Sequence, residues 1–128
     1  VRRHLSEQGE FWISIHNPPQ RRNALDGRNR PIGKYVLATG EELHVSGEYL
    51  LDTRTDIATG RQFYRCFANG KPTRSLELPV RFHLISPERL EQLLDDAELT
   101  VLQRFGTYER DDFDSAKSPV YIAQCRMS

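Results

Sequence analysis

His16 and Asn17 have side chains and a position suited to chemistry in this sequence of 128 residues. They close the stretch Glu10–Asn17, in which apolar residues alternate with other types from Phe11 to Ile15. That alternation predicts a strand with one strongly apolar face. The carboxyl end of a strand is where open α/β sheets place ligands, so the pair is a candidate site for binding a substrate. The alternative is that both side chains serve only to satisfy the backbone of the loop that follows.

A cluster of arginines lies in the next segment, 18–40, which the sequence predicts to be a loop, with Tyr35–Leu37 as either a short strand or a lid segment. Its arginines are Arg21, Arg22, Arg28 and Arg30, and Asp26 is the only acid among them. Guanidinium groups bind carboxylates and phosphates through paired hydrogen bonds, which makes an anion site one interpretation. A solvated loop is the other interpretation, since charged clusters in loops are usually solvated.

A third group of polar side chains could line a cavity if one face of a sheet closes over a ligand. It comprises Gln62, Tyr64, Arg65 and Arg81. Ordinary packing between strands is the alternative. The histidines have no spacing typical of a metal site, and no nucleophile elbow or P-loop appears. Cys66 and Cys125 read as small buried residues with reduced thiols, and neither a zinc site nor a disulfide is expected.

These residues depend on a meander of strands that occupies 41–85. Alternation predicts strands over Glu41–Asp52, Arg61–Phe67 and Arg74–Ile85. The links Ala58–Arg61 and Ala68–Lys71 contain glycine, and the Asn-Gly pair in the second supplies the positive φ values of a tight hairpin.

A helix is predicted after the meander, from Ser86 as N-cap through Pro87 at the first helical position. Its apolar stripe is Leu90, Leu93, Leu94 and Ala97. Glu98 stands just beyond it, and a left-handed cap is not expected there because the residue is not glycine. Two final strands follow, Leu99–Phe105 and Pro119–Cys125, joined by the acidic loop Gly106–Ser118. At the other end, Val1–Gly9 is predicted to be the last turns of a helix that begins upstream.

Composition and length favour one α+β domain, 1–128: an antiparallel or mixed β-sheet meander with one complete amphipathic helix. Its parts are the helix end and first strand at 1–17, the arginine-rich loop at 18–40, the meander at 41–85, and the helix with the final hairpin at 86–125. The formal net charge is zero, which removes any whole-protein argument for binding nucleic acid or an anionic membrane. No apolar run approaches the ~20 residues that span a bilayer, and no signal peptide is visible, so a cytoplasmic location is expected.

The order of these elements resembles the C-terminal half of a class I S-adenosylmethionine-dependent methyltransferase. LSEQGEF at 5–11 resembles the L-x-P-G-G-x-hydrophobic passage into the fifth strand of that Rossmann-like fold. ISPERL…LLDDAEL at 85–99 resembles the Y-T-P-E-E-L…L-L-x-x-A-G-F helix before the sixth strand. FGTY at 105–108 with SPVYI at 118–122 resembles the Y-G-D-Y…S-x-x-L-I hairpin into the seventh. The meander resembles the lid sheet of small-molecule methyltransferases.

This resemblance implies that His16 and Asn17 face a crevice between cofactor and substrate, where substrate binding or proton transfer takes place. It also implies that S-adenosylmethionine binds only if a missing half is supplied, because the G-x-G-x-G turn and the ribose-binding acid of the family are absent here. Without the fourth strand of the family, Glu10–Asn17 has an exposed apolar edge. The expected partner is a second copy of the chain or the missing N-terminal half. The alternative function is a stand-alone, non-catalytic homo-oligomer that binds a small organic or anionic ligand.

Overall fold

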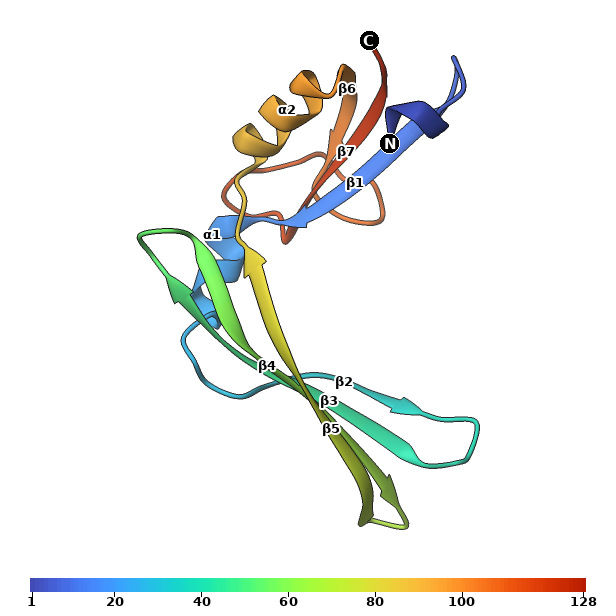
Figure 1. The fold of residues 1–128 in the computed structure, drawn as a ribbon, viewed down its shortest axis with the longest axis vertical. Helices are drawn as coiled ribbons and strands as arrows, with labels where there is room; N and C mark the ends of the chain where they lie inside the picture. The colour runs from blue at the N-terminus through green and yellow to red at the C-terminus, as the bar shows by residue number, and fades with distance from the viewer. The chain divides into compact units, whose positions relative to one another are not determined.

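The computed structural model describes residues 1–128, which form an α+β fold dominated by antiparallel strands. Two compact units make up the chain (Figure 1). The first unit combines Val1–Arg21 with Leu84–Ser128, and the second unit is Arg22–His83. The second unit is therefore an insertion between the two segments that build the first.

The first unit contains a three-stranded antiparallel sheet in the order β1-β7-β6. Its strands are β1 (Glu10–His16), β6 (Leu99–Phe105) and β7 (Val120–Met127), so all three predicted strands are confirmed to within two residues. β1 pairs with β7 and with no other strand, and it is therefore an edge strand.

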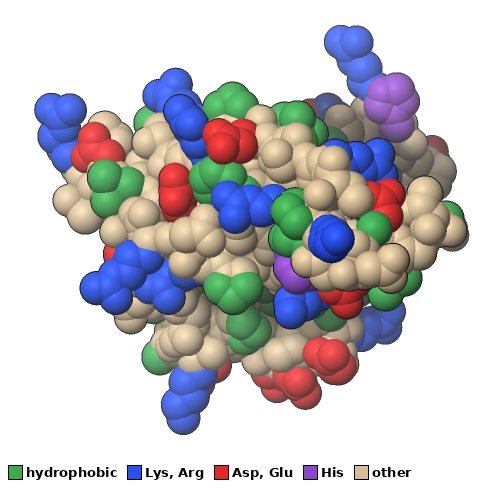
Figure 2. Space-filling view, turned by 90° about the horizontal axis from the view of Figure 1, so that it is seen from below, with side chains coloured by type: hydrophobic (Ala, Val, Ile, Leu, Met, Phe, Trp, Pro, Cys, Tyr) green, Lys and Arg blue, Asp and Glu red, His purple; other side chains and the backbone are tan.

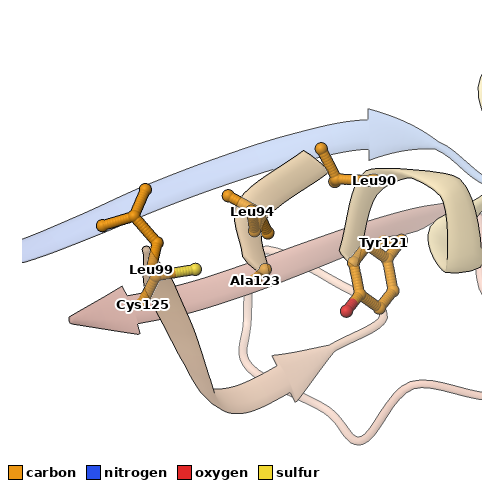
Figure 3. Packing of buried hydrophobic residues seen from close by; sticks show 6 residues of the cluster. All are labelled: Leu90, Leu94, Leu99, Tyr121, Ala123 and Cys125. Atoms are coloured by element: carbon orange, nitrogen blue, oxygen red, sulfur yellow. The ribbon is translucent and has the colours of Figure 1, made fainter. Parts of the chain in front are cut away.

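Helix α2 (Pro87–Asp96) packs on one face of this sheet and closes the core of the first unit. The predicted N-cap is confirmed, since Ser86 Oγ accepts a 3.1 Å hydrogen bond from the backbone N–H of Arg89. Leu90 and Leu94 are buried and lie in one cluster with side chains of β7 (Figure 3). Their buried neighbours are Leu99, Tyr121, Ala123 and Cys125. Leu93 is exposed, so the buried stripe of α2 is narrower than its sequence predicts.

The prediction for Val1–Gly9 is wrong: this segment contains the short 3₁₀ helix η1 (Arg2–His4) and a turn closed by Gly9 on Ser6, and Leu5 between them is extended. No residue of η1 is buried, so no packing supports a longer helix. The prediction of a loop over 18–40 is also wrong in part. It contains the helical turns α1 (Pro18–Arg21) and η2 (Arg22–Ala24), and then β2 (Arg30–Val36). The fixed φ of proline suits the first helical position that Pro18 occupies.

The second unit is a four-stranded antiparallel sheet in the order β2-β3-β4-β5. The meander is confirmed, with β3 (Glu42–Asp52), β4 (Ile57–Ala68) and β5 (Lys71–His83). The predicted Asn-Gly turn is confirmed, because Asn69 and Gly70 have φ values of 52° and 77°.

The other predicted link, Ala58–Arg61, is not a turn and lies inside β4. Residues 53–56 make the connection from β3 instead, with the Asp52 carboxylate accepting from the backbone N–H of Arg54 at 2.9 Å and Asp56 at a φ of 56°. Gly60 has a different function, since a Cβ there would lie 1.8 Å from the carbonyl oxygen of Glu48. Glycine permits close approach of two strands at this point rather than a reversal of the chain.

The expectation for Glu98 is wrong as well, because Glu98 has a φ of 57° and is left-handed. Its backbone N–H donates to the carbonyl of Asp95 at 2.8 Å. β6 begins at the next residue, so pairing with β7 holds Glu98 in a conformation that its own side chain does not favour.

The helices of the chain are all too short or too polar to cross a bilayer. On the face shown in Figure 2, Lys and Arg side chains are scattered among acidic ones rather than gathered in one patch.

Candidate functional site

Asn17 follows β1 and has its side chain almost fully buried, with 1% exposed. Its Nδ2 donates to two backbone carbonyls of the loop that precedes β7, to Ser115 at 3.0 Å and to Ser118 at 2.8 Å. Its backbone N–H donates to the carbonyl of Pro119 at 3.1 Å. Both amide hydrogens of the side chain are thereby used to fix the loop, which is the alternative that the sequence left open for this residue.

His16 is an exposed residue on the face of β1 that also holds Trp12 and Ser14, opposite to the face that α2 covers. Partial burial of the imidazole lowers its pKa, and the positive charge of Arg21 lowers the pKa further. His16 is consequently neutral at pH 7 and has a ring nitrogen available to accept a proton. Arg21 and His16 both belong to the first unit, so this effect of Arg21 on the pKa of His16 acts within one compact unit.

The predicted arginine cluster is largely paired with acids. The Asp26 carboxylate accepts from Arg30 Nη2 at 2.7 Å and from the backbone N–H of Arg28 at 3.1 Å. These contacts lower the pKa of Asp26, the hydrogen bond from Arg30 most of all. Arg22 Nη1 lies 3.0 Å from Asp56 Oδ1. Arg22, Arg28 and Arg30 therefore already have carboxylate partners in the second unit, as a solvated, acid-paired loop would.

Tyr64 and Arg81 both lie in the second unit, on opposite faces of its sheet. Tyr64 is opposite Leu76 in the register of β4 and β5, whereas Arg81 is opposite Thr59. The odd spacing between positions 59 and 64 of β4 places the two side chains on different faces. The Tyr64 hydroxyl donates to Gln62 Oε1 at 2.9 Å and borders a hollow of about 270 Å³.

Sequence reasoning missed a partly exposed polar cluster between α2 and the sheet of the first unit, in which only Tyr121 is buried. Arg104 donates two hydrogen bonds of 2.6 and 2.7 Å to the Glu91 carboxylate, and the Tyr121 hydroxyl donates to the same carboxylate. Arg104 is the main cause of the lowered pKa of Glu91, while burial raises the pKa of Tyr121. The cluster borders a hollow of about 590 Å³. Because the charges cancel, it is suited to holding α2 in place.

The residues of this chain do not fit S-adenosylmethionine. A cradle for such a cofactor needs a strand, a glycine-rich turn and the N-terminus of a helix. Every strand pair in the structure is antiparallel, and α2 follows β5 with its N-terminus capped by Ser86. Gly106 follows β6, but a Cβ there would lie 2.1 Å from Ser118 Oγ, so the glycine packs against the chain itself.

Solved structures provide the comparison for this geometry. The chain is similar to the CcbJ methyltransferase from Streptomyces caelestis, with 19% identity and a TM-score of 0.68 over 99% of this chain and 50% of that one. An S-adenosylmethionine-dependent methyltransferase from Clostridium acetobutylicum gives 13% identity and a TM-score of 0.72 over 98% and 47%. DesVI from Streptomyces venezuelae is 13% identical, with a TM-score of 0.62 over 94% of this chain and 46% of that one.

No protein-family model matches the chain, and no curated protein matches it either. The chain spans about half the length of the solved structures that it resembles. At these identities the likeness concerns the fold alone. The chain has the fold of one half of an S-adenosylmethionine-dependent methyltransferase.

Proposed function

We propose that residues 1–128 are the C-terminal, substrate-side portion of an S-adenosylmethionine-dependent methyltransferase, and that they do not transfer methyl groups alone. The proposal is supported by the extent of the structural match, since nearly all of this chain matches about half of a methyltransferase chain. In the proposal, the second unit is the lid over the substrate, and the cofactor binds to a half that these residues do not supply.

The residues at the end of β1 have the properties that a substrate side requires. The lowered pKa of His16 leaves its imidazole neutral, so that it can hold a proton released from a substrate. Asn17 positions the strand end through the loop carbonyls of Ser115 and Ser118. Arg21 and Arg22 follow in the helical turns α1 and η2, and Tyr64 and Arg81 are the residues proposed for the lid, on opposite faces of its sheet. The whole set is a proposal for substrate binding.

A titration with S-adenosylmethionine and S-adenosylhomocysteine tests the proposal. The purified chain should give no saturable heat up to about 1 mM ligand while circular dichroism shows it folded. A gene product extended upstream by a glycine-rich frame should bind one ligand per chain. Saturable binding by residues 1–128 alone, or a folded extended product that does not bind, would contradict the proposal.

We also propose that the free edge of β1 pairs with a strand outside residues 1–128, in a second copy of the chain or in a missing N-terminal half. The edge is seven residues long and contains no proline, which makes it a template for a further strand. Amide hydrogen exchange along Glu10–His16 should slow when that strand is present. Light scattering at about 100 μM tests whether the partner is a second copy of the chain, since a clean monomer at this concentration excludes all but a weak dimer.

The other candidate function is a stand-alone binding module for a small organic or anionic ligand. The observation in its favour is that hollows lined by this chain's own side chains occur within single units. A native start codon directly before Val1, together with a stable folded oligomer that ignores S-adenosylhomocysteine, would favour this candidate over the methyltransferase portion.

A further inference from the structure

The face of the first unit's sheet opposite α2 contains a hollow of about 290 Å³ with an aromatic wall. Trp12 on β1 and Phe105 at the end of β6 stack with their ring centroids 5.7 Å apart and their planes within 5°. Ile122 on β7 lies between these strands and adds an aliphatic surface. This wall is a site for an apolar ring rather than for a polar chain.

The first turn of the loop after β6 brings two polar side chains over this wall. The loop is held by hydrogen bonds of 2.8 Å, from the backbone N–H of Gly106 to the carbonyl of Asp111 and from Thr107 Oγ1 to Asp111 Oδ2. Tyr108 reaches across to β1, where its hydroxyl lies 3.3 Å from Ser14 Oγ. The Arg110 guanidinium carbon lies 5.4 Å from the centroid of the Trp12 ring.

Arg110 lies between Glu109 and Asp111 in the sequence but forms an ion pair with neither. None of the ion pairs in residues 1–128 includes it, and its side chain contacts the π face of Trp12 instead. The nearby Asp111 carboxylate is engaged by Thr107. Arg110 also has a φ of 69°, a conformation uncommon outside glycine, and its backbone N–H donates to the carbonyl of Thr107 at 3.2 Å.

We propose that this hollow, the Trp12–Arg110 pocket, binds a small planar aromatic carboxylate. The ring packs against the wall of Trp12, Phe105 and Ile122, and the carboxylate accepts paired hydrogen bonds from the Arg110 guanidinium. The hydroxyls of Ser14 and Tyr108 can donate to the same anion. The volume lies at the small end of ligand pockets, which limits the ligand to about one ring with its acid group. All residues that line the pocket belong to the first unit.

The chain contains a single tryptophan, Trp12, so its fluorescence reports on this pocket directly. We expect benzoate to change that fluorescence saturably, with a Kd on the order of 1 mM for so small a ligand. Benzamide has the same shape without the charge and should bind at least about tenfold more weakly, since a charged hydrogen-bonded pair is worth about 1.5 kcal/mol or more.

Arg110→Gln should weaken benzoate binding by about tenfold as well. Arg110 is exposed, so the variant should fold, and circular dichroism checks that it does. Arg89→Gln removes a comparable charge from α2, on the other side of the sheet, and should bind benzoate as the unchanged chain does. No saturable change up to about 20 mM benzoate would overturn the proposal. Equal affinity for benzamide, or for Arg110→Gln, would overturn it too.

Discussion

The side-chain amide of Asn17 donates a 2.8 Å hydrogen bond to the carbonyl oxygen of Ser118, a residue 101 positions later in the chain. A second hydrogen bond from the same nitrogen reaches the carbonyl of Ser115 at 3.0 Å. One buried amide therefore joins the end of β1 to the loop before β7. Asn17 thus links two parts of the first unit that are far apart in the sequence.

Asn17→Ala should loosen this loop and lower the free energy of unfolding by about 2–3 kcal/mol, because two hydrogen bonds are lost and two carbonyls are left without that donor. Trypsin should then cleave after Lys117 faster than in the unchanged chain. Gln8→Ala, an exposed change in the same unit, is the control and should leave both quantities unchanged. Equal cleavage rates at Lys117 for Asn17→Ala and the control would show that the amide does not hold the loop.

His16 should make the stability of the chain depend on pH. Its folded pKa lies below the unfolded value, so the unfolded chain binds more protons in the window between the two. The free energy of unfolding should therefore fall as the pH drops from about 7 through 6.5 toward the folded pKa. Urea unfolding at several pH values measures this slope, and His16→Gln should reduce it. His4→Gln, in the exposed turn η1, is the matched control.

Glu91 should contribute stability through its hydrogen bonds with Arg104 and Tyr121. Glu91→Gln removes the charge from a partly exposed carboxylate, and a loss of about 1 kcal/mol at pH 7 is expected after allowance for solvent screening. Because the folded pKa of Glu91 is lowered, its contribution is present above the unfolded pKa and is lost as the pH falls through the folded value. Urea midpoints at pH 7 and at about pH 3 should therefore differ less in the variant than in the unchanged chain.

Glu7→Gln provides the comparison for that experiment. Glu7 lies in the same unit, is exposed and makes no ion pair in the structure. It should change the midpoint little at either pH. If both variants behave alike, the Glu91–Arg104–Tyr121 cluster does not stabilise α2.

Gly60→Ala should disrupt the second unit. The added Cβ would lie 1.8 Å from the carbonyl oxygen of Glu48, and this neighbour is backbone that cannot turn away. We expect a loss of about 4 kcal/mol or more, because the two paired strands would have to separate to make room for the methyl group. Thr59→Ala, at the adjacent exposed position, should cost less than about 1 kcal/mol. Thermal unfolding of the two variants distinguishes them, and a similar melting temperature for both would contradict the expectation.

Local signals in the sequence predicted those elements that local chemistry decides. Ser86 and Pro87 begin α2, and Asn69-Gly70 makes the turn between β4 and β5, because each effect acts within a few residues. Ala58–Arg61 misled for the same reason. Gly60 is needed because the backbone of β3 lies too close for a side chain there. Nothing within the segment itself distinguishes such a glycine from one in a turn.

The site was less predictable because its contacts join residues that are distant in sequence. Glu91, Arg104 and Tyr121 have no recognisable spacing, and only the packing of α2 on the sheet brings them together. The pairing of Arg22 with Asp56 likewise depends on where the turn after β3 lies. His16 and Asn17 were predicted as a pair, yet alternation cannot show that one is exposed and the other is buried among loop carbonyls.

The way the second unit is inserted into the first has a consequence for the order of folding. Each strand of the second unit pairs only with its sequence neighbours, so its sheet forms by closing short loops in succession. β1 must instead find β7 across an intervening length of about 100 residues, a slow and entropically costly search. We expect the hairpins of the second unit to form first and to shorten that search by drawing Arg21 and Leu84 together. In that order the proposed lid exists before the strand end that bears His16 has its partner.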